Sequence, residues 1–388
     1  MKPHLLGVIG ARPNFIKMQA LWPAFKKMGA CDLTLVHTSQ HHDWELSQQF
    51  LHFSQLQPDF FLPINPEHDS QARFGSIMQN FSKLLRQVKP HAVLVIGDVD
   101  STLACALVAA KSEIPIIHVE AGLRCFDRSL PEEINRVLVD QLSSVLFITE
   151  DSAKINLLKE GVSEKKIHFV GNVLIDSFYQ SLAHALSLPE LNNQGFLDVV
   201  LKEKAYFLIT LHRRSLIHST QTLSECLNQL INLSTQWPVV WPIHPHTYQQ
   251  LEERKLLSRL TGRGIHLIQP VNYLQMLSLM KHALAVITDS GGLQEETTVM
   301  NIPCFTLRPN TERPITVLRG TNCLIPQVSR LYEQVMTELQ SPKQSQSAIP
   351  LWDGKAAFRI AEVSVSWMQQ EFLSLKRPGL RYAECPND

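Results

Sequence analysis

The chain has 388 residues, of which 44% are hydrophobic and 19% charged, and its 36 Lys and Arg residues balance its 36 Asp and Glu residues. At roughly 100–200 residues per domain this length predicts two or three domains, and the lack of a basic excess argues against a nucleic-acid partner or a membrane surface. The apolar runs are shorter than the roughly 18 residues of a membrane helix, and the N-terminus lacks a signal-peptide core, so export is not expected.

The first half of the chain alternates short apolar runs with longer amphipathic stretches. Strands are predicted at residues 5–10, 33–37, 92–97, 114–118 and 145–149. Apolar residues spaced by three or four predict a helix over residues 70–88. Strands that alternate with helices predict right-handed crossovers and a parallel sheet, and the continuous apolar run at 93–96 suits a sheet covered on both faces.

The second half repeats this alternation. Strands are predicted at residues 206–210, 239–243, 265–268, 285–288 and 304–307. Residues 186–195 contain Pro, Asn and Gly and are typical of a linker, and residues 355–375 could form one helix. We therefore expect an α/β fold of two doubly wound, Rossmann-like domains at residues 1–175 and 196–345 with a cleft between them, followed by a C-terminal helix within residues 351–376.

The cysteines bear on the compartment. The seven are far apart, are odd in number and include no CxxC pair. A disulfide framework or a zinc ribbon is therefore not expected, and a reducing cytoplasm is the predicted location.

Polar clusters follow seven of the predicted strands. They begin at residues 11, 40, 97, 118, 212, 244 and 288. In open α/β sheets, ligands bind beyond the carboxyl ends of the strands. One cluster alone could be a helix cap or a turn, but seven together favour a shared polar cleft.

Ser290, Gly291 and Gly292 precede a predicted helix at residues 293–300. Glycines let a ligand approach the backbone, and free N–H groups at a helix start favour negative charge, which indicates a phosphate site. The alternative is a plain serine N-cap with glycines that serve only the turn. Arg313 could add a cation, and Arg12 and Lys17 of the other domain could complete a diphosphate site.

Other cofactor motifs are absent or weak. The sequence has neither GxGxxG nor GxxxxGK[ST], so these motifs give no support to a dinucleotide-binding site or to a P-loop ATPase. Asp98 and Asp100 form a DxD tripeptide, which could bind a metal, although Asp100 could equally cap a helix. Histidines at 41–42, 244 and 246 have no third ligand at supporting spacing, so we expect no metal and no cofactor.

Acidic residues gather after two neighbouring predicted strands. Asp98 and Glu120 follow these strands, and Glu132 and Glu133 begin a helix after Pro131. The Glu pair alone would be first-turn charge favoured by the helix dipole. Beside Asp98 and Glu120, however, the pair suggests proton transfer, because crowded carboxylates spread their pKa values.

Together these motifs resemble those of the non-hydrolysing UDP-N-acetylglucosamine 2-epimerases. The matching stretches are residues 10–17 (GARPNFIK), 39–41 (SQH), 97–98 (GD), 118–124 (HVEAGLR), 131–136 (PEEINR), 170–172 (VGN), 212–214 (HRR), 288–296 (TDSGGLQEE) and 311–314 (TERP). They run in family order from residue 7 to about residue 325. No single stretch is specific, but the set is.

The resemblance implies a two-domain fold like that of the GT-B glycosyltransferases, a C-terminal helix that packs back on the first domain, and a homodimer. It implies an enzyme of polysaccharide biosynthesis that inverts C2 of UDP-GlcNAc to give UDP-ManNAc without NAD. UDP would be eliminated across C1–C2 to give 2-acetamidoglucal and would then add back, with a proton delivered to the other face of C2.

The resemblance also assigns roles to residues. By motif, Arg12, Ser290, Gly291, Gly292, Glu296 and Arg313 would hold UDP; Val271 and Met276 would pack on the uracil; Asp98, Glu120 and Glu132 would be the acid/base set at C2; and Lys17 and His212 would stabilise the leaving diphosphate. Lys17, Asp98, Glu120 and His212 would also bind the substrate. Cations around the diphosphate are needed because the C2 proton is weakly acidic until C1–O cleavage runs ahead.

The sequence departs from the family in places. Many relatives read GTRPE where residues 10–14 read GARPN, GQH where residues 39–41 read SQH, and HRRE where the motif here ends in Ser215. These changes put activation by a second UDP-GlcNAc in doubt. Three alternatives stay open: a modified UDP-sugar such as a 2,3-diacetamido uronic acid, a glycosyltransferase of the same fold, and a UDP-sugar-binding regulator without turnover.

Overall fold

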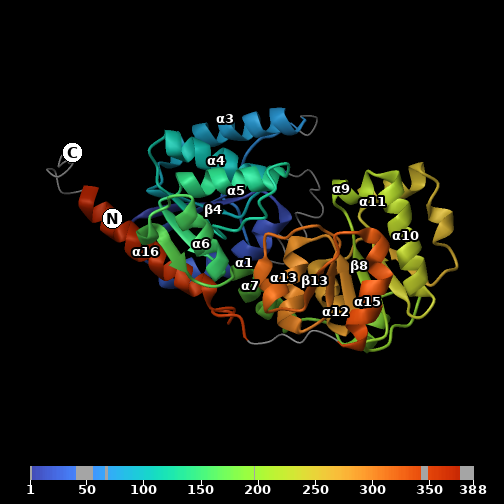
Figure 1. Ribbon diagram of the computed structural model, residues 1–388. Coiled ribbons are helices and arrows are strands. Elements are labelled where there is room, and N and C mark those ends of the chain that lie inside the picture. The colour runs from blue at the N-terminus through green and yellow to red at the C-terminus, as the bar shows by residue number, and fades with distance from the viewer. Residues whose placement is uncertain (1, 41–55, 66–68, 196, 342–347, 376–388) are drawn as a thin grey trace. The chain divides into compact units, whose positions relative to one another are not determined.

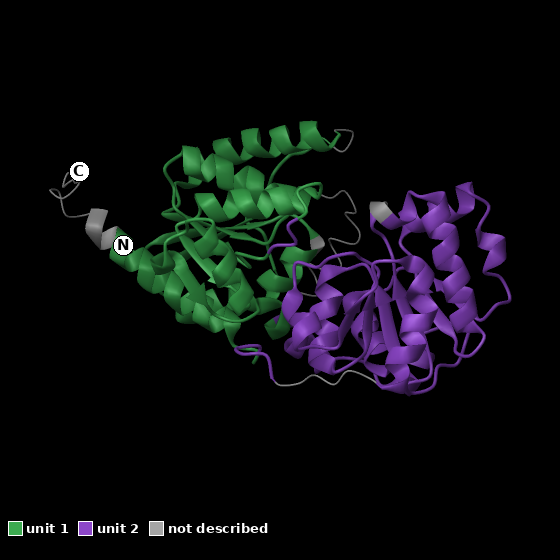
Figure 2. Ribbon diagram, in the orientation of Figure 1, with its two compact units in different colours: residues 1–123, 127–176, 353–388 green, residues 124–126, 177–352 purple. Residues whose placement is uncertain are grey.

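The structure is a computed structural model that describes residues 2–40, 56–65, 69–195, 197–341 and 348–375 (Figure 1). It divides into two compact units (Figure 2). Unit 1 comprises Met1–Leu123, Asp127–Asp176 and Asp353–Asp388, and unit 2 comprises Arg124–Phe126 and Ser177–Trp352. Of the predicted domain ranges, residues 1, 41–55, 66–68, 196, 342–345 and 376 lie outside the described residues.

Unit 1 is built on a parallel sheet. Its described strands are β1 (His4–Ile9), β2 (Asp32–His37), β3 (Phe60–Phe61), β4 (Ala92–Ile96), β5 (Ile116–Val119), β6 (Val145–Ile148) and β7 (Ile167–Phe169). They lie in the order β3-β2-β1-β4-β5-β6-β7, and every pair is parallel. The strand order reverses between β1 and β4, so this is the switch point at which doubly wound sheets bind ligands.

Helices connect these strands and cover the sheet. They are α1 (Arg12–Met28), α3 (Ser70–Val88), α4 (Asp100–Lys111), α5 (Pro131–Leu142), α6 (Asp151–Lys159), η1 (Glu164–Lys166) and α16 (Ala356–Leu375); α7 (Val173–Leu182) begins in unit 1 and continues into unit 2. Local chemistry sets their ends: Asp69 accepts a hydrogen bond from Ala72 N at the start of α3, and Gly29 ends α1 in the left-handed region. The C-terminal helix α16 packs against α1 within unit 1 (Figure 1).

Unit 2 repeats this architecture. Its described strands are β8 (Phe207–Thr210), β9 (Val239–Pro242), β10 (Ile265–Ile268), β11 (Ala285–Thr288), β12 (Cys304–Thr306) and β13 (Asn322–Leu324), in the parallel order β10-β9-β8-β11-β12-β13. The switch point lies between β8 and β11. The helices are α8 (Leu188–Asn192), α9 (Arg214–Ile217), α10 (Thr220–Ser234), α11 (Pro245–Glu253), η2 (Leu257–Arg259), α12 (Tyr273–His282), α13 (Gly291–Met300), α14 (Pro314–Leu318), η3 (Val328–Arg330) and α15 (Leu331–Gln340).

Each unit has its own core. In unit 1, β4 is buried along its whole length and packs with α3 and α4 through Phe81 and Leu85 of α3. In unit 2, Trp241 of β9 and Phe207 of β8 are fully buried beneath α10. Sheets covered on both faces explain why these strands are apolar almost throughout.

The predicted fold class is confirmed: the molecule contains two parallel sheets with alternating helices. The helix predicted over 70–88 is α3, and every predicted strand is present with bounds shifted by at most two residues. The linker prediction at 186–195 is wrong, because this segment contains α8, whose Leu191 is fully buried and which contacts α12. Among the described residues, none of the helices is both long and apolar enough to cross a membrane.

Candidate active site

Two carboxylates that the sequence analysis proposed for proton transfer follow neighbouring strands of unit 1. Asp98 follows β4, and Glu120 follows β5, which pairs with β4 up to Ile96 and Val119. Carboxyl ends of parallel strands meet at one edge of a sheet, so both residues lie at that edge. Glu120 is buried, and Asp98 is partly exposed.

Lys17 of α1 reaches this edge. Its ammonium group forms an ion pair with Glu120, and both side chains are buried. A Cβ placed on Gly97 would lie 3.6 Å from Lys17 Nζ, so the ammonium also lies beside the segment that carries Asp98. The structure thus brings Lys17, Glu120 and Asp98 together, whereas the sequence analysis placed Lys17 at the diphosphate rather than beside Glu120.

Arg136 connects the other acidic residues. Its Nη2 lies 2.7 Å from Asp98 Oδ2, and its Nη1 donates to Glu133 Oε2. Glu133 is buried in this ion pair, whereas its neighbour Glu132 is only partly buried. The two adjacent glutamates therefore differ: Glu133 fixes Arg136, and Glu132 is accessible. Sequence reasoning did not nominate Arg136, although it lies in the PEEINR motif.

Glu120 has an uncommon backbone. Its φ is 72°, in the left-handed region that non-glycine residues rarely adopt. The turn is held by Glu120 N and Ala121 N, which both donate to Phe147 O at 3.1 and 2.9 Å. Strained backbone of this kind is typical of functional sites and persists only where the surroundings enforce it.

Asn14 fixes the loop between β1 and α1. Its Oδ1 accepts hydrogen bonds from Gly10 N and Ala11 N at 3.1 and 3.0 Å, and its Nδ2 donates to Ile96 O at 3.0 Å. The loop that leads into Arg12 is thereby tied to the end of β4. A glutamate carboxylate at this position could accept the first two bonds but could not donate the third. Arg12 begins α1, and its side chain lies outside the described part of the chain, as does His41.

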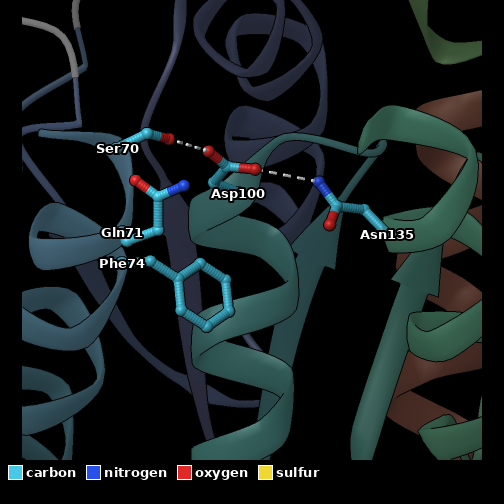
Figure 3. A pocket seen from close by; sticks show the side chains of 5 residues that line it. All are labelled: Ser70, Gln71, Phe74, Asp100 and Asn135. Atoms are coloured by element: carbon cyan, nitrogen blue, oxygen red, sulfur yellow. Dashed lines mark hydrogen bonds between the residues drawn. The ribbon is translucent and has the colours of Figure 1, made fainter. Parts of the chain in front are cut away.

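A small hollow of about 280 Å³ opens beside this edge (Figure 3). It is lined by Ser70, Gln71, Phe74, Asp100 and Asn135. Asp100 accepts hydrogen bonds from Ser70 Oγ at 3.4 Å and Asn135 Nδ2 at 3.2 Å (Figure 3). Asp100 is the first residue of α4 but does not cap it: the N-cap is Val99, and no side chain makes the capping bond, so the predicted cap role is wrong. Its charge in the first turn is favoured by the helix dipole. No group of three or more His, Cys, Asp or Glu side chains arranged for a metal occurs in the described residues.

The switch point of unit 2 carries His212 and Asp289. Asp289 is fully buried at the end of β11, and its Oδ2 accepts hydrogen bonds from His212 N and Arg213 N at 2.9 and 2.8 Å. Its Oδ1 lies 3.1 Å from His212 Nδ1, and the His212 ring is half-exposed. Asp289 thus orients both the backbone and the ring of His212. The sequence analysis quoted Asp289 only within the motif at residues 288–296 and assigned it no role.

Ser290, Gly291 and Gly292 lie at the start of α13, as predicted. A Cβ on Gly291 would approach Arg313 Nη1 to 2.4 Å and Glu312 Oε1 to 2.6 Å, so only glycine allows this contact. Arg313 forms ion pairs with Glu312 and, through Nε at 2.9 Å, with Glu295. The buried guanidinium is therefore fixed beside the helix start, where both favour an anion.

Glu296 lies one turn further along α13 and is buried. Tyr273 OH donates a 2.7 Å hydrogen bond to Glu296 Oε1. Burial raises the pKa of Glu296 to about 7, with the Tyr273 hydrogen bond opposing the rise and Glu295 adding to it. Val271 is buried just before α12, and Met276 of α12 is partly buried. Tyr273 was missed, because nothing in its local sequence separates it from a core aromatic residue.

The candidate residues therefore form two separate sets, one in each unit. Unit 1 gathers Lys17, Asp98 and Glu120, with the partly buried Glu132 on the helix that carries Arg136; unit 2 gathers His212, Ser290, Gly291, Gly292, Glu296 and Arg313. The first set can move protons, and the second can hold an anion and hydroxyl groups.

Comparison with known proteins gives a consistent result. Residues 23–364 match the family model described as UDP-N-acetylglucosamine 2-epimerase. The UDP-N-acetylglucosamine 2-epimerase of Methanococcus maripaludis is 41% identical over 82% of this chain and 86% of its own length. The UDP-2,3-diacetamido-2,3-dideoxy-D-glucuronate 2-epimerase of Pseudomonas aeruginosa is 37% identical over 92% of this chain and 98% of its own length.

A solved structure agrees. The crystal structure of Methanocaldococcus jannaschii UDP-GlcNAc 2-epimerase in complex with UDP-GlcNAc and UDP is 36% identical, with a TM-score of 0.85, and covers 94% of this chain and 99% of that one.

Proposed function

Because the chain belongs to the UDP-N-acetylglucosamine 2-epimerase family, we propose that it inverts C2 of UDP-N-acetylglucosamine to give UDP-N-acetylmannosamine without hydrolysing the nucleotide. The observation that carries this proposal is the set of carboxylates at the switch point of unit 1. Asp98 and Glu120 lie at one sheet edge, each paired with a cation. A C2 inversion needs proton exchange on both faces, and hence more than one acid/base group.

The first stage is an elimination. As the C1–O bond breaks, its electron pair leaves with UDP, a carboxylate takes the C2 proton, and the C–H electron pair becomes the C1–C2 double bond of 2-acetamidoglucal. The C2 proton becomes acidic only as positive charge develops at C1. Charge stabilisation of the departing diphosphate is therefore the largest demand on the protein.

The second stage reverses the first on the other face. UDP adds to C1, and a carboxylic acid delivers a proton to C2 from the opposite side. In our proposal Asp98, Glu120 and Glu132 form the acid/base set. The ion pair with Lys17 holds the Glu120 carboxylate in place, and the Glu132 side chain is only partly buried. Neither stage transfers a hydride, so the proposed route needs no nicotinamide.

Unit 2 is proposed to hold UDP. The diphosphate would meet Ser290, Gly291 and Gly292 at the start of α13, with Arg313 beside them, and Glu296 would accept hydrogen bonds from the ribose hydroxyls. Val271 and Met276 would contact the uracil. Arg12, Lys17 and His212 would stabilise the leaving diphosphate, with Asp289 orienting His212.

The same residues could act on a modified sugar. The Pseudomonas aeruginosa relative, named as a 2-epimerase of a UDP-2,3-diacetamido uronic acid, covers more of this chain than the Methanococcus maripaludis relative, although at lower identity. The elimination and re-addition would be identical, because neither involves C3 or C6. UDP-2,3-diacetamido-2,3-dideoxy-glucuronic acid is therefore the second candidate substrate.

One experiment tests the function. The protein is incubated with UDP-GlcNAc, and separately with the diacetamido uronic acid substrate, in D2O, and C2 deuteration is followed by NMR. We expect deuterium at C2 of both epimers of the true substrate, with UDP retained in the product. Acceptor-dependent UDP release without C2 exchange would instead mean a glycosyltransferase.

The family resemblance further supports a homodimer in the cytoplasm that supplies polysaccharide biosynthesis. Light scattering coupled to size-exclusion chromatography tests the dimer. A mass near that of one 44.0 kDa chain would rule it out at the concentration used.

A further inference from the structure

A buried histidine connects the loops that carry the two proposed carboxylates. His118 of β5 is fully buried. Its Nδ1 lies 2.7 Å from Asp140 Oδ1, and its Nε2 lies 3.0 Å from Gly97 O. Gly97 directly precedes Asp98. His118 therefore reaches from its own strand to the end of β4.

Asp140 extends the connection in the other direction. It lies on α5, is buried, and its Oδ2 accepts a hydrogen bond from Gly122 N at 3.0 Å. Gly122 ends the turn that begins at Glu120, where φ is 72°. A Cβ on Gly122 would meet Ala153 O at 2.6 Å, so this turn can move little. The chain of contacts from Gly97 through His118 and Asp140 to Gly122 thus spans both loops.

The contacts fix the orientation of the ring. Gly97 O can only accept, so His118 Nε2 donates to it, and the other ring nitrogen faces the Asp140 carboxyl group. The ring cannot turn without losing both contacts. We propose that this bridge from Gly97 through His118 and Asp140 to Gly122 is the positioning device that sets Asp98 against Glu120.

Two further carbonyls beside Asp98 are held by side chains. Ile96 O accepts from Asn14 Nδ2 at 3.0 Å and from Thr102 Oγ1 at 2.9 Å, and Asp98 O accepts from Asn135 Nδ2 at 2.8 Å. The carbonyl oxygens of residues 96, 97 and 98 are therefore each held by a side chain. Of these side chains, His118 also connects to the Glu120 turn, through Asp140. Since acid/base catalysis depends on placing groups to within a fraction of an ångström, rigid support of this kind affects turnover more than binding.

This inference rests on the proposed function only through the roles of Asp98 and Glu120; the contacts of His118 can be measured without any substrate. The protein, labelled with ¹⁵N-histidine, is examined by NMR. We expect one histidine whose Nε2 carries a proton that exchanges slowly with solvent, because that proton is bonded to Gly97 O, and whose signals are absent from His118→Asn. A His118 spectrum with a bare or freely exchanging Nε2 overturns the bridge.

Kinetics test the positioning role, with the same substitution at His168 as control. His168 lies on β7 of the same sheet, is half-buried and contacts neither loop. We expect His118→Asn to lower kcat on the order of a hundredfold with KM within about twofold, and His168→Asn to retain wild-type values. Equal kcat in the two folded variants overturns the positioning role. If the wild type epimerises no UDP-sugar, the proposed function fails, whereas the NMR result still decides whether His118 bridges the two loops.

Discussion

Tyr273 donates a 2.7 Å hydrogen bond to Glu296 Oε1 inside unit 2, and both side chains are buried. Burial raises the pKa of Tyr273 and brings the pKa of Glu296 to about 7. Glu296 is therefore the proposed UDP ligand whose charge changes near neutral pH. Two predictions follow from this one contact, one on binding and one on stability.

Binding of UDP should weaken as the pH falls through 7. Glu296 can accept hydrogen bonds from two ribose hydroxyls only as a carboxylate, and that form prevails above about pH 7. Between about pH 8 and pH 6 we expect the Kd of UDP to rise roughly tenfold, measured by calorimetry. Glu296→Gln is the control, because it removes the Glu296 titration and leaves only that of the UDP phosphate. Parallel pH profiles for the two proteins would contradict the role of Glu296.

The same carboxyl group should lower the stability of the ligand-free protein at high pH. The pKa of Glu296 is about 7 in the folded state and has its ordinary value of 4.5 in the unfolded state. Between pH 4.5 and about pH 7, the folded protein therefore binds a proton at Glu296 that the unfolded protein does not. The stability linked to this proton is complete below pH 4.5 and is lost as the pH rises through about 7. At about pH 8, Glu296→Gln should therefore be more stable by up to about 3 kcal/mol, as judged by thermal melting. The gain should vanish near about pH 5; a gain independent of pH would point to packing instead.

Adjacent glutamates should respond differently to the same change. Glu132→Gln should lower C2 exchange about 100-fold or more with no loss of melting temperature, because its side chain is only partly buried and would act in proton transfer. Glu133→Gln should instead destabilise the fold by on the order of 3 kcal/mol, because it removes a buried partner of Arg136. Deuterium exchange and melting curves of the two variants, measured side by side, distinguish the roles. The reverse pattern would move the catalytic assignment to Glu133.

Proton exchange at C2 should depend on residues of unit 1, and UDP binding should depend on residues of unit 2. Asp98→Asn should abolish C2 exchange and leave the Kd of UDP within about twofold, because Asp98 lies in the proton-transfer set. Arg313→Ala should raise the Kd of UDP about tenfold or more, because it removes a fixed guanidinium beside the start of α13. Calorimetry with UDP and exchange in D2O check both. Full turnover by Asp98→Asn would remove Asp98 from the acid/base set.

Gly291 should not tolerate a methyl group. In Gly291→Ala the new Cβ would collide with Arg313 and Glu312, so the guanidinium must move away from the helix start. We expect UDP affinity to fall about tenfold or more, measured by calorimetry. Gly75→Ala is the matched control: Gly75 is exposed within α3 with nothing within 4 Å of its Cβ position, so alanine should stabilise the protein by about 0.5–1 kcal/mol. Unchanged UDP binding in Gly291→Ala would separate this glycine from the site.

The fold was largely predictable because its signals are local. The apolar runs at 93–96 and 285–288 are buried strands, and the three- and four-residue spacing over 70–88 is α3. The polar clusters after β4, β5, β8 and β11 also lie where parallel topology puts them. The linker prediction for residues 186–195 was wrong because Pro and Asn occur at helix ends as well as in linkers, and because Leu191 within the segment is a core residue.

The interior of the site was less predictable, because it depends on pairs distant in sequence. His118 and Asp140 are 22 residues apart, and Tyr273 and Glu296 are 23 apart. Neither spacing has a periodic signature that a single sequence displays. Likewise, nothing local distinguishes Glu132 from Glu133; only the direction in which α5 turns each side chain decides which one meets Arg136.

The left-handed backbone of Glu120 has a consequence for protein engineering. Glycine would relieve the conformational penalty at this position, of about 1–2 kcal/mol, but would leave the buried ammonium of Lys17 without this carboxylate, at a cost of about 3–5 kcal/mol. A library selected only for heat tolerance would therefore retain Glu120 for its ion pair. Retention of Glu120 in such a library is thus no evidence of turnover, and selection here has to score product formation and melting together.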